Sequence, residues 1–313
     1  MKLVIVGSVA LDDVKTPHGA IRRGLGGSAV YASLAASQFV VPGIVGVVGE
    51  DFPDEHLALL KRQGIALDGL ERAAGKTFHW SGYYTGDMNE AHTVATELNV
   101  FAAFKPRLPR EWRDAPFVFL ANIDPDLQNQ VLDQMIRPSM VVLDTMNLWI
   151  ENKREQLLRV MKRADLLVVN EGEARLLSGE PNVVRAGRWL MRRGPRGVAI
   201  KRGACGAMVM WGKETWLLPA YPVDEVKDPT GAGDTFAGGL IGILAQGRAL
   251  TAESLRRAVA VGTVLAAHTV EAFSVQGLTG LKAGEVQRRY RYLASQRIPS
   301  WTLRMRLKQR RRP

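Results

Sequence analysis

Short apolar runs recur along this chain, and stretches with the periodicity of amphipathic helices separate several of them. The runs are continuously apolar, which is typical of strands buried on both faces of a parallel sheet. Strands that alternate with helices predict an α/β fold built on a doubly wound, mostly parallel sheet. The expected strands are 3–6, 43–48, 117–120, 140–143, 166–169 and 197–200, and the helical stretches are 54–63, 126–135, 154–163 and 186–193.

The last hundred residues follow a different order. Two segments have the composition of antiparallel strands, and three helical segments follow them. These strands are 207–211 and 214–218, and the helices are 235–246, 252–269 and 283–295. Because no internal repeat or low-complexity linker interrupts the sequence, we expect a single domain over 1–295 and a basic tail over 296–313.

Residues 75–98 break the alternation of strands and helices. Aromatic and β-branched residues flank a turn that contains Gly86, and this pattern predicts a β-hairpin. A hairpin has no place in a parallel sheet, so it either closes over a site as a lid or forms a dimer contact. Residues 14–23 are also rich in turn formers and are expected to add a strand to this lid.

The composition, with 46% hydrophobic and 23% charged residues, is that of a soluble globular protein. No apolar run approaches the roughly 18 residues that a transmembrane helix needs, and the start becomes polar too soon for a signal peptide. Cys205 is the only cysteine, which excludes an internal disulfide and a metal site built from cysteines. We therefore expect a cytoplasmic protein without a membrane partner.

The net charge of +11 is concentrated at the C-terminal end. Residues 286–313 contain ten basic and no acidic residues, which leaves +1 for residues 1–285. Basic tails are more often solvated than functional. The alternative is a salt-sensitive, nonspecific affinity for RNA or anionic surfaces. We therefore expect no specific nucleic-acid partner.

The most informative run is Asp228-Pro-Thr-Gly-Ala-Gly-Asp-Thr-Phe-Ala-Gly-Gly239. Gly231 and Gly233 allow a tight turn and a close approach to a ligand, and the chain becomes helix-compatible from Ala232. The first amides of a helix are free and lie at the positive end of its dipole, so this turn is a candidate anion site. Asp234 falls in the first helical turn, where its carboxylate could hold a substrate hydroxyl. The simpler reading is a turn followed by an N-terminal helix acid.

Polar side chains follow other expected strands. Asp12, or Asp13 in the alternative register, comes after the first strand, and acids at the carboxyl ends of parallel strands lie where α/β sheets bind ligands. Asn170 and Glu173 follow the strand at 166–169 and also have the spacing of a helix cap. Further strand ends that point to the same edge of the sheet carry Asp124, Asp144 and Asn147.

The run from 228 to 239 resembles the C-terminal signature of the ribokinase-like (PfkB) family of carbohydrate and nucleoside kinases. The other elements occur in the order found in that family, so the resemblance covers nearly the whole chain. It implies a three-layer, ribokinase-like fold with a small β-lid. It also implies that Asp234 is the catalytic base, that the amides of Ala232, Gly233 and Asp234 form an anion hole, and that Gly231 belongs to the same catalytic loop.

The resemblance also implies where the acceptor binds. The family uses an aspartate and a Gly-Gly pair to bind sugar hydroxyls, and Asp12, Gly26 and Gly27 match these positions. Tyr31 stands where the family commonly has asparagine. A phenol can stack or donate one hydrogen bond but cannot act as an amide fork, so an ordinary ribokinase specificity is not expected.

Aromatic residues slightly favour a nucleoside over a free sugar as the acceptor. Phe78, Trp80 and Tyr83 lie on the predicted hairpin, and with Tyr31 they supply more aromatic surface than a bare sugar needs. Aromatic faces stack well on bases. The alternative is that these side chains pack the lid or a dimer contact.

The remaining family elements concern the nucleotide and cations. The implied nucleotide contacts are Asn170, Lys201, Gly203, Gly206, Thr230, Gly231, Gly233 and His268. Glu173 would organise Mg²⁺ through its waters, and Asp228 belongs to a loop that often binds a monovalent cation such as K⁺. A plain glycine turn explains Gly203 and Gly206 nearly as well, and a lone histidine late in a helix is more often structural.

These features predict an ATP-dependent phosphotransferase that moves the γ-phosphoryl group to a hydroxyl of a small sugar or nucleoside. Asp234 would be the base, ATP and Mg²⁺ the cofactors, and a homodimer could form through the lid. The alternative from another class is a non-catalytic ligand sensor with the same fold, whose basic tail binds RNA or another anion. The presence of Asp234, its adjacent glycines and Glu173 argues against that alternative.

Overall fold

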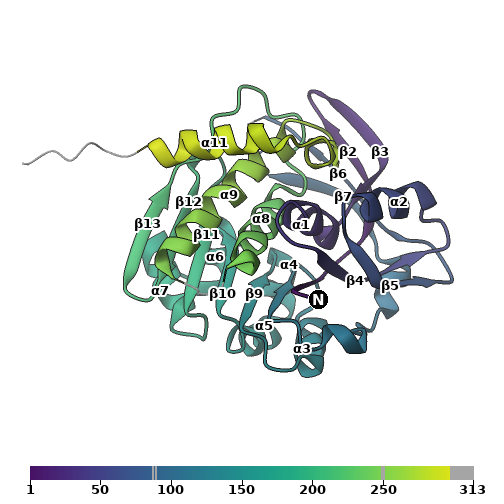
Figure 1. The fold of residues 1–313 in the computed structure, drawn as a ribbon, viewed down its shortest axis with the longest axis horizontal. Coiled ribbons are helices and arrows are strands. Elements are labelled where there is room, and N and C mark those ends of the chain that lie inside the picture. Colours follow the sequence, from purple (N-terminus) through teal and green to yellow (C-terminus); the bar gives the residue numbers. More distant parts are fainter. Residues whose placement is uncertain (87, 89, 248–250, 297–313) are drawn as a thin grey trace, which may run out of the picture.

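The expected apolar runs form one nine-stranded sheet through the centre of the molecule (Figure 1). The computed structural model describes residues 1–86, 88, 90–247 and 251–296, so the expected tail lies outside the described residues except for Gln296. Seven neighbouring strands are parallel, and the last two are antiparallel as predicted. In sheet order the strands are β13 (Glu214–Leu218), β12 (Ala207–Trp211), β11 (Gly197–Lys201), β10 (Leu166–Asn170), β9 (Met140–Asp144), β8 (Phe117–Leu120), β1 (Leu3–Val6), β4 (Pro42–Gly49) and β5 (Ala66–Ala73).

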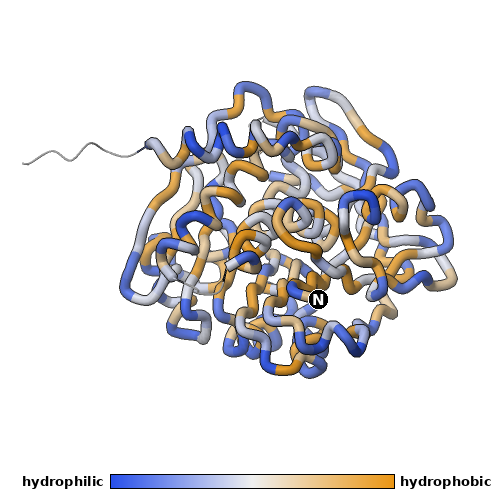
Figure 2. The backbone as a smooth tube through the Cα atoms, in the orientation of Figure 1, coloured by the Kyte–Doolittle hydropathy of each residue, from blue (hydrophilic) through white to orange (hydrophobic). Residues whose placement is uncertain are grey.

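Helices cover both faces of this sheet, which gives the predicted three-layer α/β architecture. Alternate residues of each strand face opposite layers: Leu3 and Ile5 pack into one core, and Val4 and Val6 pack into the other. Figure 2 shows the apolar positions gathered along the central strands and the helix faces that cover them. One layer contains α1 (Ser28–Ala36), α2 (Asp54–Arg62), α8 (Ala232–Gln246), α9 (Ala252–Val270), α10 (Gln276–Thr279) and α11 (Ala283–Ser295), and the other contains α3 (Pro125–Gln134), α4 (Asn147–Asn152), α5 (Arg154–Met161), α6 (Glu171–Ser178) and α7 (Val183–Met191).

The strand β5 was not among the expected strands. It pairs with β4 at the edge of the sheet, and its sequence Ala-Leu-Asp-Gly-Leu-Glu-Arg-Ala contains neither β-branched nor aromatic residues. An edge strand needs only one partner and tolerates charged side chains. Pairing with β4 therefore outweighs the weak intrinsic strand preference of these residues.

A separate four-stranded sheet forms the lid, in the order β3-β2-β6-β7. Its strands are β2 (Ala10–Thr16), β3 (Gly19–Gly26), β6 (Phe78–Tyr84) and β7 (Ala91–Glu97). The predicted hairpin is present as β6 and β7, whereas the first lid segment extends to residues 10–26 and not only 14–23. This correction has a physical reason. β2 pairs in parallel with β6, and this long-range pairing stabilises a strand in residues whose sequence has only a weak strand preference.

No helix in the described ranges is long and apolar enough to cross a membrane.

Candidate active site

Three adjacent strands of the main sheet end in polar residues at the same edge. Asp144 ends β9, Asn170 ends β10 and Lys201 ends β11. The Nζ atom of Lys201 lies 3.3 Å from Oδ2 of Asp144, so the two side chains meet across the end of β10. The amide of Thr145 donates to the other oxygen of Asp144 at 2.8 Å. The carboxyl ends of these parallel strands thus carry charged side chains at the place where α/β sheets bind ligands. We call Asp144, Lys201 and the neighbouring Glu173 the charged floor.

Glu173 is added to this floor by the first turn of α6. The side chain of Asn170 accepts from the amide of Glu173, the side chain of Glu173 accepts from the amide of Asn170, and both distances are 2.7 Å. This reciprocal capping box confirms the predicted helix cap and fixes Glu173 next to the strand ends. Glu173 is 7% exposed, so its carboxylate is nearly withdrawn from solvent.

The signature run forms the predicted turn and helix start. Gly231 has φ of 75° and precedes α8, whose first residue is Ala232. A Cβ at Gly231 would overlap the ring of Tyr31, and a Cβ at Gly233 would lie 3.0 Å from Nζ of Lys201. We call residues 229–233 the anion loop. Its glycines allow it to fit between an aromatic ring and an ammonium group. The amide of Ala232 donates to the carbonyl oxygen of Pro229 at 3.2 Å and is therefore not free as expected, so the anion site at the start of α8 depends on the amide of Gly233.

Asp234 lies in the first turn of α8, beside the charged floor. Burial raises its pKa to about 7; Asp144 and Glu173 add to this effect and Lys201 opposes it. A carboxyl group with this pKa exchanges a proton near neutral pH, which is the property required of a general base.

The charges of the floor influence each other strongly. Burial and the carboxylate of Asp144 raise the pKa of Glu173 to about 7, although Lys201 acts against them. Burial would lower the pKa of Lys201, but the surrounding carboxylates of Asp144, Glu173 and Asp234 outweigh it and raise that pKa. Lys201 is therefore a fixed positive charge among three acids.

The lid brings a further acid into the site. Asp12 on β2 is 7% exposed, its carboxylate accepts from the amide of Gly27, and a Cβ at Gly26 would overlap it. Burial, then Asp228 and Asp234, raise the pKa of Asp12 to about 8. Its Oδ1 has no hydrogen-bond partner within the described part of the chain. A buried oxygen without a partner is costly and is a natural acceptor for a ligand hydroxyl.

The alternative residue Asp13 lies on the other face of the lid. Its Oδ1 accepts from the amide of Arg23 at 2.6 Å and lies 3.5 Å from Nε2 of His79. Successive residues of a strand point to opposite faces. Asp12, rather than Asp13, therefore faces the site.

The aromatic residues of the lid divide between its two faces. Trp80 and Tyr84 pack in a small cluster with Val14, whereas Tyr83 stacks on His92 at a centroid distance of 4.9 Å. Tyr83 is thus separated from the site by the sheet itself, contrary to the role suggested for it above. The remaining aromatic of the predicted acceptor set, Phe78, contacts the ring of Phe101 at 5.6 Å.

The ring of Tyr31 packs against the anion loop. The ring is 2% exposed and fills the space that the missing Cβ of Gly231 leaves. Burial, then Asp12, Asp228 and Asp234, raise the pKa of its phenol well above the ordinary value. The expected stacking of Tyr31 on an acceptor is therefore corrected, because its ring faces are already covered by protein.

Thr230 joins the anion loop to the lid. Its hydroxyl donates to the phenol oxygen of Tyr84 at 3.3 Å, and Val226 packs against the same lid cluster. The contact joins residues 146 positions apart, and no pattern in the sequence pointed to Tyr84. The Asp144–Lys201 pair was missed for the same reason, since Asp144 was recognised only as a polar end to a strand and Lys201 only as an implied nucleotide contact.

Asp228 joins two loops through hydrogen bonds. Its Oδ1 accepts from the amide of Thr230 at 2.9 Å and its Oδ2 accepts from the amide of Ser274 at 3.1 Å. Burial raises its pKa despite these two hydrogen bonds. Both oxygens are engaged, so a K⁺ site at this loop stays a prediction from the family resemblance.

His268 lies buried between α9 and α11. Its Nδ1 is 3.8 Å from the carboxylate of Glu271, and burial, followed by the charge of Arg289, lowers its pKa. These contacts match the structural role considered for it above. A nucleotide contact from His268 stays a prediction.

The turn after Lys201 connects β11 to β12. Gly203 begins its single 3-10 turn, and Gly206 has φ of 85° and packs so closely on Leu218 that a Cβ would overlap that residue's carbonyl oxygen. Arg202 donates to Glu171 at 2.7 Å and ties the turn to α6. Backbone geometry alone therefore accounts for Gly206, while its contact to a nucleotide stays a prediction.

Asp124 was one of the strand-end acids expected at the site, but it acts as a helix cap. It accepts from the amide of Asp126 at 2.9 Å and pairs with Lys153 at 2.6 Å. Its charge is satisfied within α3 and its surroundings.

The charged floor fits a divalent cation held mainly by a ligand and by water. The described residues contain no cluster of three or more acidic, histidine or cysteine side chains placed to hold a metal ion directly. Asp144, Glu173 and Asp234 nevertheless outnumber Lys201, so these side chains carry an excess of acidic groups. Mg²⁺ keeps several waters and binds through few carboxylates together with phosphates.

Comparison with known proteins agrees with this geometry. The chain matches the model of the pfkB family of carbohydrate kinases over residues 2–279. It is 32% identical to a cytidine kinase of Thermococcus kodakarensis over 259 residues, which cover 80% of this chain and 91% of that protein.

Solved structures share the fold. A nucleoside kinase of Burkholderia thailandensis in complex with ADP-inosine has a TM-score of 0.78 and 18% identity, covering 97% of this chain and 99% of that chain. An Arabidopsis thaliana ribokinase complexed with ribose and ATP has a TM-score of 0.75 and 20% identity, covering 92% of this chain and 98% of that chain. The ribokinase-like fold expected from the sequence is confirmed, and the chain belongs to the PfkB family of carbohydrate and nucleoside kinases.

Proposed function

We propose that this kinase transfers the γ-phosphoryl group of ATP to a hydroxyl of a nucleoside, with Asp234 as the base. The observation that carries the proposal is the position of Asp234. It follows the anion loop directly, at the start of α8, and it is close enough to Asp12 of the lid to raise that residue's pKa. The base thus lies between a place for a phosphoryl group and a place for an acceptor hydroxyl.

The reaction follows from this arrangement. The acceptor hydroxyl gives its proton to Asp234, its oxygen forms a bond to the γ-phosphorus, and the bond from that phosphorus to the ADP oxygen breaks. The amide of Gly233 and the positive end of α8 stabilise the charge on the transferred group. Phosphoryl transfer depends mainly on such positioning and charge stabilisation.

Asp12 would orient the acceptor. Its unpartnered Oδ1 can accept a hydrogen bond from a second hydroxyl, and Gly26 and Gly27 let the ligand approach the backbone beside it. A ribose ring presents neighbouring hydroxyls, so one can meet Asp12 while another meets Asp234.

The preference for a nucleoside rests on two supports. The relative at 32% identity is a cytidine kinase, and Trp80 supplies an aromatic side chain on the face of the lid that also carries Asp12. The structural similarity to a nucleoside kinase that binds inosine is in keeping with this choice. A free sugar is the second candidate, favoured by the similarity to a ribokinase that binds ribose.

Glu173 and Asp144 would face Mg²⁺ when it is bound with ATP. The metal would share the negative charge of the phosphates and lower the repulsion that those phosphates meet at the carboxylates of the floor.

A K⁺ ion near Asp228 and a homodimer through the lid are further expectations. Assays with and without K⁺, and the molar mass in solution, test them.

A panel of acceptors tests the proposed function. Purified protein with ATP and Mg²⁺ is offered cytidine, uridine, adenosine, inosine, ribose and fructose at equal concentrations, and ADP formation is measured. We expect the highest kcat/KM on a nucleoside. Turnover on sugars alone would contradict the nucleoside preference, and dependence on a phosphoryl donor other than ATP would contradict the ATP assignment.

A further inference from the structure

Lys201 is placed to do more than balance a buried charge. It ends β11 and lies against the anion loop, since a Cβ at Gly233 would be only 3.0 Å from its Nζ. A phosphoryl oxygen held by the loop amides lies about 2.9 Å from their nitrogens. The ammonium group of Lys201 is therefore within reach of any anion bound at this loop.

The two members of the Asp144–Lys201 pair differ in exposure. The side chain of Asp144 is 3% exposed, whereas that of Lys201 is 18% exposed. Asp144 is also held at its other oxygen by the amide of Thr145. The acid is thus the fixed, enclosed member, whereas part of the Lys201 side chain reaches solvent.

The charges around Lys201 come from several elements. Asp144 on β9, Glu173 on α6 and Asp234 on α8 all act on it, so the floor is strongly negative before any ligand arrives. ATP would bring further negative charge to the same place. A positive group at the loop is required if the γ-phosphoryl group is to approach Asp234 without strong repulsion.

We propose that Lys201 is a catalytic residue whose ammonium group contacts the transferred phosphoryl group, and that Asp144 positions it. The inference rests on the proposed phosphoryl transfer at Asp234. Lysine suits this task because its ammonium is a compact charge with three donors, so it can keep one contact to Asp144 while it donates to the phosphoryl group.

A purely structural role does not explain why an ion pair occupies this position. Replacing a buried ion pair by apolar residues of similar volume is often neutral or stabilising. The strand residues just before Asp144 and Lys201, Leu143 and Ile200, are fully buried apolar side chains. A charged pair at the end of these strands is therefore best explained by a ligand that needs the charge.

The first test uses Lys201→Met, which keeps the length of the side chain and removes its charge. We expect kcat to fall about 10²- to 10³-fold, as for the loss of one donor to the developing charge. KM for ATP should change less than about threefold, because the contact strengthens in the transition state. Lys201→Arg should recover at least about tenfold of the loss, since it restores a charged donor of different shape.

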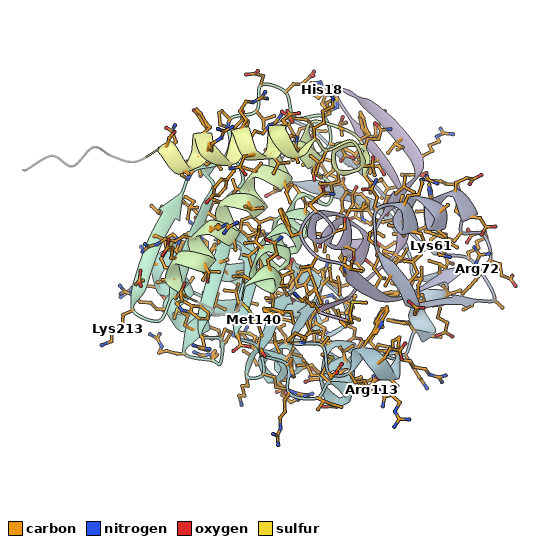
Figure 3. All side chains as sticks on the ribbon, in the orientation of Figure 1. His18, Lys61, Arg72, Arg113, Met140 and Lys213 are labelled. Carbon is orange, nitrogen blue, oxygen red and sulfur yellow. The ribbon has the colours of Figure 1, made fainter. Side chains whose placement is uncertain are left out.

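The matched control is Lys213→Met. Lys213 is exposed at the turn between β12 and β13 and projects outward, away from the strand ends (Figure 3). This variant should keep the kcat and KM of the wild type.

The second test separates catalysis from charge balance. Lys201→Met leaves Asp144 buried without its partner, so this variant should melt at a lower temperature. The double variant Lys201→Met/Asp144→Asn removes both charges and should regain thermal stability. Its kcat should stay as low as that of Lys201→Met. If Lys201→Met does not fold, the kcat of the double variant alone tests the catalytic role of Lys201.

Two outcomes would overturn the role of Lys201: a kcat of Lys201→Met within about threefold of the wild type, or recovery of kcat in the double variant. Asp234→Asn distinguishes this failure from that of the proposed function. If Asp234→Asn is inactive while the Lys201 variants are active, only the inference on Lys201 is wrong. If Asp234→Asn is active, the assignment of Asp234 as the base in the proposed function is wrong.

Discussion

The candidate site has two parts that are built by different means, the proposed phosphoryl end and the proposed acceptor end. At the phosphoryl end, the strands β9, β10 and β11 and the helix α8 place Asp144, Lys201 and Asp234 together, on a sheet buried under helices. At the acceptor end, Asp12 lies on a separate lid sheet that reaches the anion loop through Tyr84.

The two ends also differ in how their charges are balanced. Asp234 has Lys201 near it, and its pKa is about 7. Asp12 is surrounded by other acids, its Oδ1 lacks a partner within the described residues, and its pKa is about 8. Under the proposed function, the phosphoryl end is thus prepared for reaction before ligands arrive, whereas the acceptor end would gain its missing hydrogen bond only when a hydroxyl binds.

The largest effect is expected at the phosphoryl end. Asp234→Asn keeps the shape of the side chain but cannot accept the hydroxyl proton. We expect kcat to fall about 10³- to 10⁴-fold, near the upper range for a general base. Binding of ATP, measured by calorimetry, should remain close to that of the wild type. Near-normal turnover would show that the base has been assigned wrongly.

A smaller effect is expected at the acceptor end. In Asp12→Asn the side chain offers one acceptor oxygen in place of two and places an amide group against the amide of Gly27. We expect kcat/KM for the acceptor to fall about 10²-fold, because leaving a buried polar group without its partner costs up to about 3 kcal/mol. KM for ATP should hardly change. Asp13→Asn, on the outer face of the lid, is the matched control, and an equal loss in both variants would contradict the assignment.

The phosphoryl end could be predicted from the sequence because its residues occur close together in recognisable patterns. Asp234 follows its glycines directly, and Asn170 and Glu173 have the spacing of a capping box. The parallel strands of the main sheet could be predicted equally well, because each is a continuous apolar run. The exception is β5, whose strand conformation is imposed by pairing with β4 at an edge.

The acceptor end could not be predicted in the same way, because it depends on contacts between distant residues. Tyr31 was identified by its departure from a family pattern, yet its burial under Gly231 depends on the packing of α1 against α8. The faces of the lid follow from the register between β2 and β6, which places Trp80 beside Asp12 and leaves Tyr83 on the outside. A shift by one residue would exchange these faces.

The pH dependence provides the third test. Because Asp234 must be ionised to act as a base, kcat/KM should rise about tenfold from pH 6 to pH 8, as expected for a pKa of about 7. Stability should change in the opposite sense. The ordinary pKa of 3.8 is raised to about 8 for Asp12 and about 7 for Asp234, so between these values the folded state holds protons that the unfolded state has lost. The free enzyme should therefore melt at a lower temperature at pH 8 than at pH 6.

The Asp12→Asn variant makes this test specific to one end of the site. It removes the titration of Asp12 and leaves those of Asp234 and Glu173, so the decrease in melting temperature between pH 6 and pH 8 should become smaller, while the pH profile of kcat should stay. If melting temperature rises with pH in the wild type, the environments described for these carboxyl groups are wrong.

The smallest effect concerns the contact that joins the two ends. Tyr84→Phe removes the oxygen that accepts from Thr230 and keeps the ring in its cluster with Val14. The net contribution of one neutral hydrogen bond, about 0.5–1.5 kcal/mol, corresponds to a two- to tenfold change. We expect KM for the acceptor to rise within that range, because the lid loses its polar link to the anion loop. Tyr83→Phe, on the outer face of the same strand, should leave KM unchanged. If both variants behaved alike, the lid and the anion loop would be independent, and the acceptor end would owe its geometry to apolar packing alone.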